Sequence, residues 1–180
     1  MVLLELNKSK FCLQHYLMTL HTLKIQRPDG DTYISNLEHF PISTVDFVLT
    51  KGKKFLLIKR NEGAFSGEWF VAGGRQERGE TQIEALKHIA QREVGLHEND
   101  ILVVTFSHFQ DVFNPASITS GGPLPEWHSI WHFYTIEVPE TFEPILDSTS
   151  DEFRWVEDLS DITVPEPVLY ALTSASIITL

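Results

Sequence analysis

The sequence predicts a mixed α/β or α+β fold in which a mixed β-sheet is sandwiched between helices. Strand and helix patterns intermingle along the 180 residues, which is typical of this class. Two strand patterns, 43–50 and 54–59, are separated by only three residues, and one helix pattern, 81–95, carries a signal at each end. The length suits one core, so we expect a single domain over 1–180, with residues 1–40 as an N-terminal extension packed on it.

The N-terminal extension allows two interpretations. Leucines at roughly helical spacing favour an amphipathic helix over 3–22, and the alternative is a strand over 20–26. The segment 27–31 contains the dipeptide Asp29-Gly30, which is a strong turn signal. We expect a strand over 32–35 after this turn, so that these pieces form an N-terminal hairpin.

The central strands are the clearest elements. Residues 43–50 read STVDFVLT and residues 54–59 read KFLLIK, and the short link between them predicts a hairpin. A loop containing two glycines follows over 61–68. The short apolar run 69–71 is then stopped by Gly73-Gly74.

The helix over 81–95 has its apolar positions at helical spacing. Thr81 can cap its start, with Glu84 at the capping-box position three residues later. Gly95 can end it in a left-handed conformation.

The second half of the chain is expected to contain three strands and a helix. The strands cover 101–106, 129–138 and 153–156, and the final helix covers 167–178. Residues 114–127 form a long polar loop, and loops of this length are usually functional or disordered.

Composition limits the partners. The chain has 25 acidic and 14 basic residues, a formal net charge of −11, which argues against nucleic acid or an acidic membrane surface. A phosphate ligand would therefore need a cation or a local arginine cluster. Cys12 is the single cysteine, so no intrachain disulfide can form, and we expect a reducing, cytoplasmic location. We find neither a signal peptide nor an apolar run long enough to span a membrane.

The segment GRQERGETQIEALKHIAQREVGL, residues 74–96, resembles the Nudix signature, which implies the Nudix fold. Gly and Glu positions of that signature are matched, while three helix positions depart from it. The matching residues are Gly74, Glu80, Glu93, Gly95 and Leu96. The departures are His88 for an arginine, and Ile89 and Arg92 for two glutamates.

A single Mg²⁺ is the cofactor that this segment can bind. Residues 89, 92 and 93 share one helix face, but only Glu93 among them is a carboxylate. Mg²⁺ needs only one or two carboxylates together with phosphates and waters, and the glycine turn lets the Gly73 carbonyl approach closely. The alternative is that the turn is an ordinary loop and Glu93 a solvated carboxylate.

Residues 40–165 resemble the GDP-mannose mannosyl hydrolase branch of Nudix proteins. That branch also lacks the first helix glutamate and has a non-acidic residue at the position of Arg92. The shared runs are Asp46-Phe47-Val48, Leu56-Leu57-Ile58-Lys59-Arg60, Gly67-Glu68-Trp69-Phe70-Val71, Gly73-Gly74-Arg75, His128 at the start of a strand, and Asp151-Glu152-Phe153-Arg154-Trp155.

The resemblance implies hydrolysis of a nucleotide-sugar substrate at the sugar carbon, giving GDP and the free hexose. Arg60 and Arg75 would hold the diphosphate, which suits the fixed fork of a guanidinium. His128 would be the general base for water, and Asp46 would lie near the sugar or assist the cation. The resemblance also implies a homodimer.

Further candidates lie near the predicted base. Trp127 cannot bind metal, so Glu126 is the nearest candidate for a further metal ligand, while Trp127 can stack on a base or cover a sugar. His108, near Asp111, is a candidate for the sugar pocket, and a surface pair is the alternative. His128 itself has an alternative as a hydrogen-bonded strand residue in the core.

Two rival functions remain. The first is a Nudix pyrophosphohydrolase on ADP-ribose or another nucleoside-diphosphate derivative, which would cut at phosphorus. Ile89 and Arg92 disfavour it, because attack on phosphorus often uses several cations. The second is a catalytically silent domain that binds a nucleotide sugar. His88 supports it, because it replaces the arginine that would steady the metal carboxylate.

Overall fold

The computed structural model describes residues 28–179. Within them lie three α-helices, a 3₁₀ turn and nine strands. Their bounds are α2 (Gly30–His39), β1 (Ile42–Lys51), β2 (Lys54–Arg60), β3 (Trp69–Phe70), β4 (Ala72–Arg75), α3 (Gln82–Val94), η1 (Glu98–Asp100), β5 (Val103–Asn114), β6 (Ser117–Thr119), β7 (Gly122–Leu124), β8 (Trp127–Glu137), β9 (Ser150–Val156) and α4 (Glu166–Ser174).

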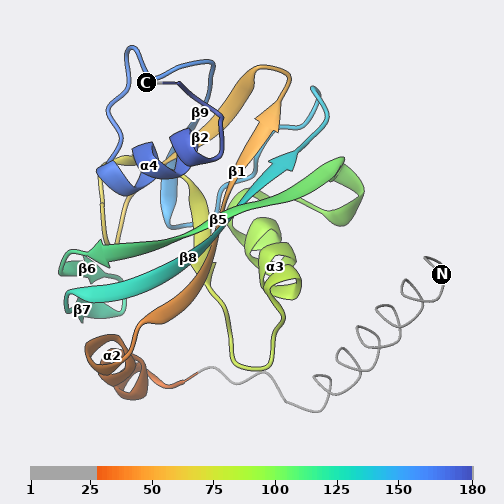
Figure 1. Ribbon diagram of the computed structural model, residues 1–180. Helices are drawn as coiled ribbons and strands as arrows, with labels where there is room; N and C mark the ends of the chain where they lie inside the picture. Colours follow the sequence, from red (N-terminus) through yellow and green to blue (C-terminus); the bar gives the residue numbers. More distant parts are fainter. Residues whose placement is uncertain (1–27, 180) are drawn as a thin grey trace, which may run out of the picture.

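The main sheet is mixed and has the strand order β3-β2-β1-β8-β5, with β9 paired to β2 and β4 paired to β1. Strands β1 and β8 run parallel along residues 42–50 of β1, and the other pairs of this sheet are antiparallel. On its other side β1 pairs with β4 at residues 44–47 and with β2 at Thr50 and Lys51. Since β2 and β4 share one side of β1 in succession, the sheet splits there (Figure 1).

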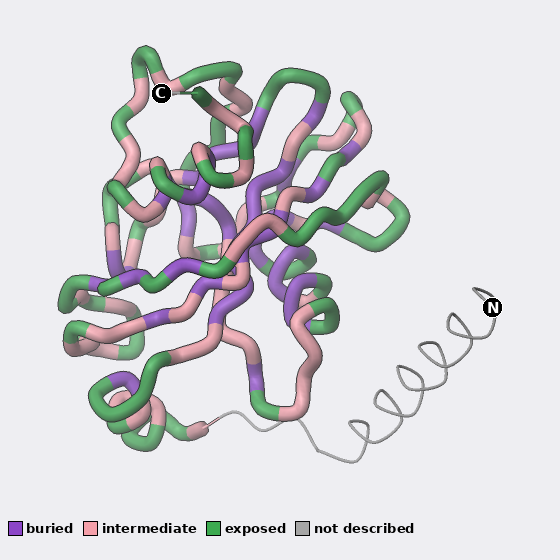
Figure 2. The backbone as a smooth tube through the Cα atoms, viewed as in Figure 1, coloured by how far each residue is buried: buried purple, intermediate pink, exposed green. Residues whose placement is uncertain are grey.

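Two hydrophobic cores fill the two faces of the sheet. Helix α3 packs its buried residues against Phe47, Leu49 and Ile58 on one face. Helix α4 packs against Leu57 and Phe133 on the other face. Figure 2 shows the buried residues concentrated in the central strands and on α3. The predicted mixed sheet between helices is therefore confirmed.

The predicted strand over 32–35 is wrong, because these residues lie in helix α2. The Asp29-Gly30 pair starts this helix instead of a hairpin turn: the Asp29 carboxylate accepts a hydrogen bond from the Thr32 N–H at 2.8 Å. An aspartate at the N-cap satisfies a free N–H of the first turn, and this local bond outweighs the strand preference of Thr32 and Ile34. The interpretations over 3–22 and 20–26 lie outside the described residues.

The predicted long loop over 114–127 is also wrong. Strand β5 continues to Asn114, eight residues beyond its predicted end, and the antiparallel pair β6–β7 forms a small hairpin. The hairpin turns at Ser120 and Gly121, and Gly122 begins β7 with a φ of 115°, a conformation that favours glycine. Long-range pairing of β5 with β8 along its whole length extends β5, which no local pattern indicated.

The helix predicted over 81–95 is confirmed as α3. Thr81 and Glu84 form the reciprocal capping box, and Gly95 ends the helix with a φ of 67°. The hairpin β1–β2 and the strands β8 and β9 are likewise confirmed. The final helix α4 ends at Ser174, earlier than predicted.

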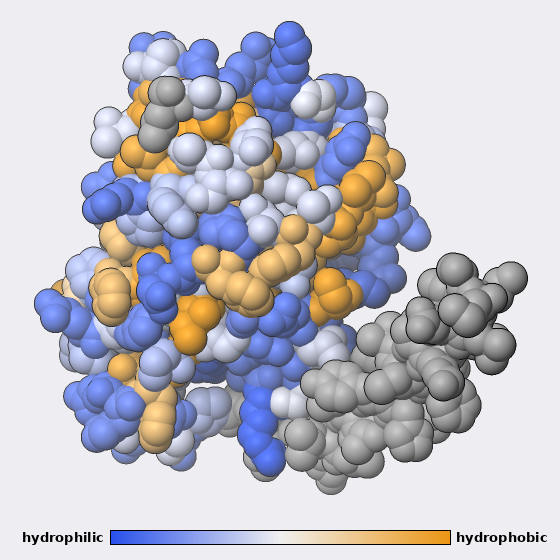
Figure 3. Space-filling model, in the orientation of Figure 1, coloured by the Kyte–Doolittle hydropathy of each residue, from blue (hydrophilic) through white to orange (hydrophobic). Residues whose placement is uncertain are grey.

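Exposed apolar side chains gather along β5, which is an edge strand. Figure 3 shows hydrophobic side chains reaching this face of the molecule. The exposed members on or beside this strand are Leu102, Val103, Val104, Phe106, Phe109 and Phe113. No helix within residues 28–179 is long and apolar enough to cross a membrane.

Candidate functional site

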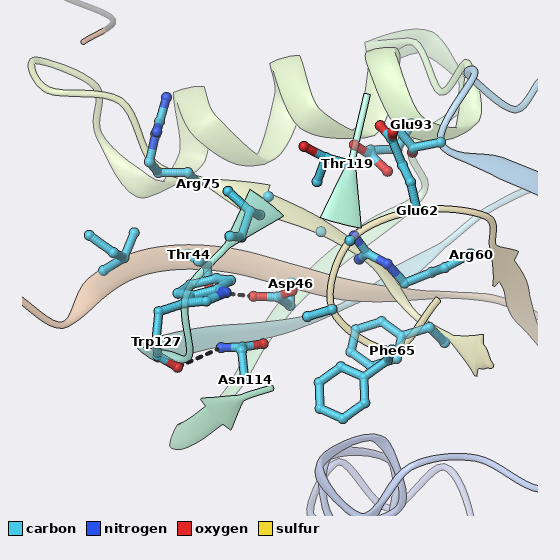
Figure 4. Close-up of a pocket in the computed structure, with 18 of the residues that line it drawn as sticks. Thr44, Asp46, Arg60, Glu62, Phe65, Arg75, Glu93, Asn114, Thr119 and Trp127 are labelled. Atoms are coloured by element: carbon cyan, nitrogen blue, oxygen red, sulfur yellow. Dashed lines mark hydrogen bonds between the residues drawn. The ribbon is translucent and has the colours of Figure 1, made fainter. Parts of the chain in front are cut away.

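A cavity of about 230 Å³ opens where the sheet splits. Its wall is built from β1, β2, β4, the last turn of α3, the loop after β2, and the β6–β7 hairpin. Figure 4 shows Asp46 between Trp127 and Arg60, with Glu93 entering from α3. The sequence-predicted residues that line this cavity are Asp46, Arg60, Gly73, Arg75, Glu93 and Trp127; because the family resemblance implies a diphosphate at Arg60 and Arg75, we name it the diphosphate cavity.

Asp46 is the buried carboxylate at the centre of this cavity. It pairs with Gly73 across β1 and β4, and a side chain at Gly73 would collide with its carboxylate. The Thr44 hydroxyl donates a hydrogen bond to it at 2.6 Å. Burial raises the pKa of Asp46 to about 7, against the opposing effects of the Thr44 bond and the Arg60 charge. A carboxyl group with such a pKa changes protonation near neutral pH.

The two arginines lie on opposite sides of Asp46 (Figure 4). Arg60 ends β2, and its guanidinium carbon lies 5.3 Å from the Phe70 ring centre. Arg75 ends β4, where its Nη2 donates to Glu77 at 2.9 Å and its guanidinium covers the Tyr33 ring at 4.4 Å. Both residues line the cavity, but in Figure 4 the Arg60 guanidinium points toward its centre, whereas the Arg75 side chain points away from Asp46.

Three buried donors of this cavity have no hydrogen-bond partner among the described residues. They are Nε of Arg60, Nε of Arg75 and Nε1 of Trp127. Buried polar atoms are nearly always paired in folded proteins, so each of these donors needs a partner from a ligand or from water. Because all three are donors and two are charged, the matching ligand is an anion rich in oxygen, such as a diphosphate.

Glu93 is a buried carboxylate at the end of α3, with its side chain 9% exposed. Its Oε1 accepts a hydrogen bond from Nη2 of Arg92 at 2.7 Å. Burial raises the pKa of Glu93 above its ordinary value, and the bond from Arg92 opposes that rise. Arg92 thus donates a hydrogen bond to the carboxylate that the sequence predicts as a metal ligand.

The donor set fits one magnesium ion and does not fit a cluster. Within the described part of the chain, no three His, Cys, Asp or Glu side chains converge on one point. Glu93, Asp46 and the backbone of Gly73 meet at one cavity, and Mg²⁺ takes one or two carboxylates with phosphate oxygens and waters. Arg92 holds Oε1 of Glu93, so a cation there would bind the other carboxylate oxygen or displace Arg92. Ile89, by contrast, is fully buried in the core.

His88 does not contact Glu93. Its Nδ1 lies 3.0 Å from a carboxylate oxygen of Glu80, and Glu80 also accepts a hydrogen bond from the Glu77 N–H at 3.0 Å. His88 thus lies beside Glu80 of the loop before α3 without a hydrogen bond from either ring nitrogen among the described residues, and the cation beside Glu93 is Arg92.

His128 and Glu126 line a second cavity of about 710 Å³, which adjoins the diphosphate cavity. The two cavities share Phe65, Asn114 and Trp127 as lining residues. Nε2 of His128 lies 2.8 Å from a carboxylate oxygen of Asp111. The structure therefore does not bring Glu126 or His128 to Glu93.

His108 lies at neither of these two cavities. Its ring nitrogens are within hydrogen-bond distance of Ser107 and Gln110, and its ring packs edge-on against Tyr170 of α4. These contacts are on the α4 side of the sheet.

Sequence reasoning did not identify Thr44, Glu62 and Thr119 as cavity residues. Thr44 had a signal, because it lies two residues before Asp46 and so on the same face of β1. Glu62 had none. Its carboxylate accepts a hydrogen bond from the Ser120 N–H at 2.7 Å, 58 residues away, and so ties the β6–β7 hairpin to the loop after β2.

A family model and a relative match this chain. The model of the NUDIX domain matches residues 41–166. The low-salt glycan biosynthesis protein Agl8 of Haloferax volcanii is 33% identical over 101 residues, which cover 55% of this chain and 62% of Agl8. The match thus spans about three-fifths of that relative's length.

Two solved structures show the same fold. The NUDIX domain of Shewanella oneidensis NrtR, determined with ADP ribose, has a TM-score of 0.59 at 17% identity, covering 83% of this chain and 97% of that one. A NUDIX hydrolase from Nitrosomonas europaea has a TM-score of 0.57 at 17% identity, covering 76% and 88%. At these identities the likeness concerns the fold alone.

Proposed function

The chain belongs to the Nudix family, and from this premise we propose that it is a Mg²⁺-dependent hydrolase of a nucleoside-diphosphate sugar. The substrate we propose is GDP-mannose, cut at the sugar C–O bond to give GDP and mannose. One observation carries this proposal: two arginines with unpartnered buried donors face a cavity that holds a single helix carboxylate, Glu93. The relative Agl8 bears the name of a glycan biosynthesis protein, which fits a sugar-containing substrate.

The sparse carboxylates favour attack at carbon over attack at phosphorus. Attack at a sugar C1 passes through an oxocarbenium-like state with a diphosphate leaving group. Fixed cationic groups stabilise the charge on that leaving group, and Arg60 and Arg75 provide them. The two helix positions at which the Nudix signature has further glutamates are occupied by Ile89 and Arg92. Ile89 is buried in the core, and Arg92 donates a hydrogen bond to Glu93.

Each residue of the site has a proposed task. Glu93 and the Gly73 carbonyl would hold the Mg²⁺, and Asp46 would assist there. The cation, when bound, neutralises charge on the diphosphate. His128 would take a proton from the attacking water, and such a base contributes about 10²–10⁴-fold to the rate. A cytoplasmic location and a homodimer belong to the same proposal.

The orientation of His128 supports its role as a base. Asp111 accepts a hydrogen bond from Nε2–H, so the neutral ring leaves Nδ1 as its acceptor. A carboxylate that holds an imidazole in one tautomer is a recurring arrangement around general bases.

The test is hydrolysis of GDP-mannose with Mg²⁺ in ¹⁸O-water, with the products identified by mass spectrometry. We expect GDP and mannose, with the label on mannose. GMP and mannose-1-phosphate, with the label on a phosphate, would instead establish a pyrophosphohydrolase. ADP-ribose would then be the next substrate to test, since the NrtR domain was determined with ADP ribose.

One observation favours a second candidate, a silent domain that binds a nucleotide sugar. The 2.7 Å hydrogen bond from Arg92 occupies Oε1 of Glu93, and the positive charge of a permanently paired Arg92 would oppose the binding of Mg²⁺. Calorimetric titration with GDP-mannose, together with the turnover assay, separates the two functions. Tight binding without turnover of GDP-mannose or of any other nucleotide sugar would favour the silent domain.

A further inference from the structure

The second cavity lies directly beside the diphosphate cavity and has a different chemistry. Its wall comes from the end of α2, the end of β5 and the start of β8, with Phe40, Phe113 and Glu126 among its lining residues. We propose that this cavity is the binding subsite for the hexose of the nucleotide sugar. The proposal rests on the proposed function and adds the place and orientation of the substrate.

The position of the two cavities is the first argument. Phe65, Asn114 and Trp127 line both, so the cavities are direct neighbours. The unpartnered donors of Arg60 and Arg75 belong to the diphosphate cavity. A hexose attached to a diphosphate in the first cavity would, in this proposal, lie beyond Trp127 in the second.

The lining residues of the second cavity suit a sugar ring. Phe40 is 64% exposed and Phe113 is 76% exposed, so two large apolar rings border the hollow without being covered by protein. Sugar rings have apolar C–H faces that pack on aromatic rings, while their hydroxyls need polar partners placed around them. Glu38, Glu126 and Asn114 line the same cavity, and their side-chain oxygens accept hydrogen bonds from hydroxyls.

The Asp111–His128 pair decides which end of the substrate enters this cavity. Phe113 stacks on the His128 ring at 4.8 Å with an angle of 27° between the planes, and Asp111 holds Nε2 at 2.8 Å. Plane and tautomer of the imidazole are thus both fixed by β5. A hexose here places C1 on the His128 side of the diphosphate. If the nucleobase occupied this cavity instead, C1 of the sugar would lie on the opposite side of the diphosphate, away from His128.

The experiment compares GDP-mannose with GDP, which lacks the hexose. Steady-state kinetics for GDP-mannose and calorimetric Kd values for GDP are measured for the full chain and for Phe113→Ala and Glu126→Gln. Phe109→Ala and Glu137→Gln are the matched controls, since both residues are exposed and outside the cavity. We expect kcat/KM for GDP-mannose to fall about 10-fold in the two cavity variants, while the Kd for GDP changes less than about 2-fold.

Two results would overturn the hexose assignment. An equal loss for GDP-mannose and for GDP would assign the cavity to the nucleobase. No change in either ligand beyond that of the controls would mean that the substrate does not use this cavity. If the protein does not turn over GDP-mannose, calorimetry with GDP-mannose and GDP on the same variants gives the same comparison. The hydrolase proposal can then fail while the subsite is still tested.

Asp111 has its own test as a positioning residue. Asp111→Asn should lower kcat for GDP-mannose about 10-fold with KM nearly unchanged, and Asp111→Glu should recover part of the loss. NMR of the imidazole nitrogens should show the Nε2–H tautomer of His128 in the unmodified protein and a mixture in Asp111→Asn. An unchanged tautomer and an unchanged kcat would show that Asp111 is only a surface partner.

Discussion

Asp46 offers the most direct test of the physics of the site, through stability as well as activity. Burial raises its pKa from the ordinary 3.8 to about 7. Between these two values the folded protein keeps a proton that the unfolded chain has released. The free energy of unfolding therefore falls as the pH rises from about 3.8 to about 7, and this contribution is constant above that range.

The size of the effect follows from the pKa difference of about 3 units. At about 1.4 kcal/mol for each unit, ionised Asp46 costs about 4 kcal/mol of stability above pH 7. The Asp46→Asn variant carries no such charge and keeps an oxygen that can accept the Thr44 hydrogen bond. We expect it to be more stable than the unmodified protein by about 4 kcal/mol at pH 8 and by only about 2 kcal/mol at pH 5.

The assay is urea unfolding followed by tryptophan fluorescence, at pH 5 and pH 8 in EDTA. The exposed Asp161 provides the control variant, Asp161→Asn. A stability difference that is the same at both pH values would refute the reasoning, since it would mean that Asp46 has no raised pKa. If Asp46→Asn gains stability and loses turnover, the carboxylate is kept for function at a cost in stability.

The other predictions concern the cation, the base, the diphosphate and the helix cap. Glu93→Gln should lower Mg²⁺-dependent turnover of GDP-mannose at least about 100-fold, with exposed Glu98→Gln as control; a normal rate would remove Glu93 from the metal site. His128→Gln should lower kcat about 10²–10⁴-fold without changing the Kd for GDP, and an unchanged kcat would exclude it as the base. Arg75→Lys should raise KM about 10-fold, because an ammonium cannot reproduce the guanidinium fork; an unchanged KM would place the diphosphate elsewhere. Thr81→Ala should lower the free energy of unfolding by about 1 kcal/mol, measured by urea unfolding; a loss of kcat in the folded variant would contradict its purely structural role.

Local sequence signals were sufficient to predict those elements that are stabilised by residues close together in the sequence. Helix α3 is an example, since Thr81, Glu84 and Gly95 act within one or two turns of the helix they delimit. The hairpin β1–β2 needs only three linking residues. At the N-terminal extension two local signals competed, and the Asp29 cap on Thr32 won over the strand preference of the residues that follow.

The site residues were predictable where they lie in the glycine turn at Gly73 or in helix α3. Gly73, Arg75 and Glu93 come from that single segment, and the resemblance added Asp46 and Arg60 from the two preceding strands. All five line one cavity. His108, Glu126 and His128 were harder, because the face on which a side chain emerges depends on the exact register of β5 with β8. The register shift between Phe106 and His108 changes that face partway along β5.

By itself the sequence determined the fold class, the limits of α3, and the chemistry available to the site: one helix carboxylate, two arginines and a glycine turn. Only the tertiary structure decided how these groups are arranged. The split between β2 and β4 opens the cavity, Arg92 covers Glu93, and Asp111 on β5 holds His128 on β8. The physical reason is that composition and local spacing select helices, turns and ligand types. Burial, pKa and tautomer depend on neighbours that are distant in sequence and that meet only when the sheet has formed.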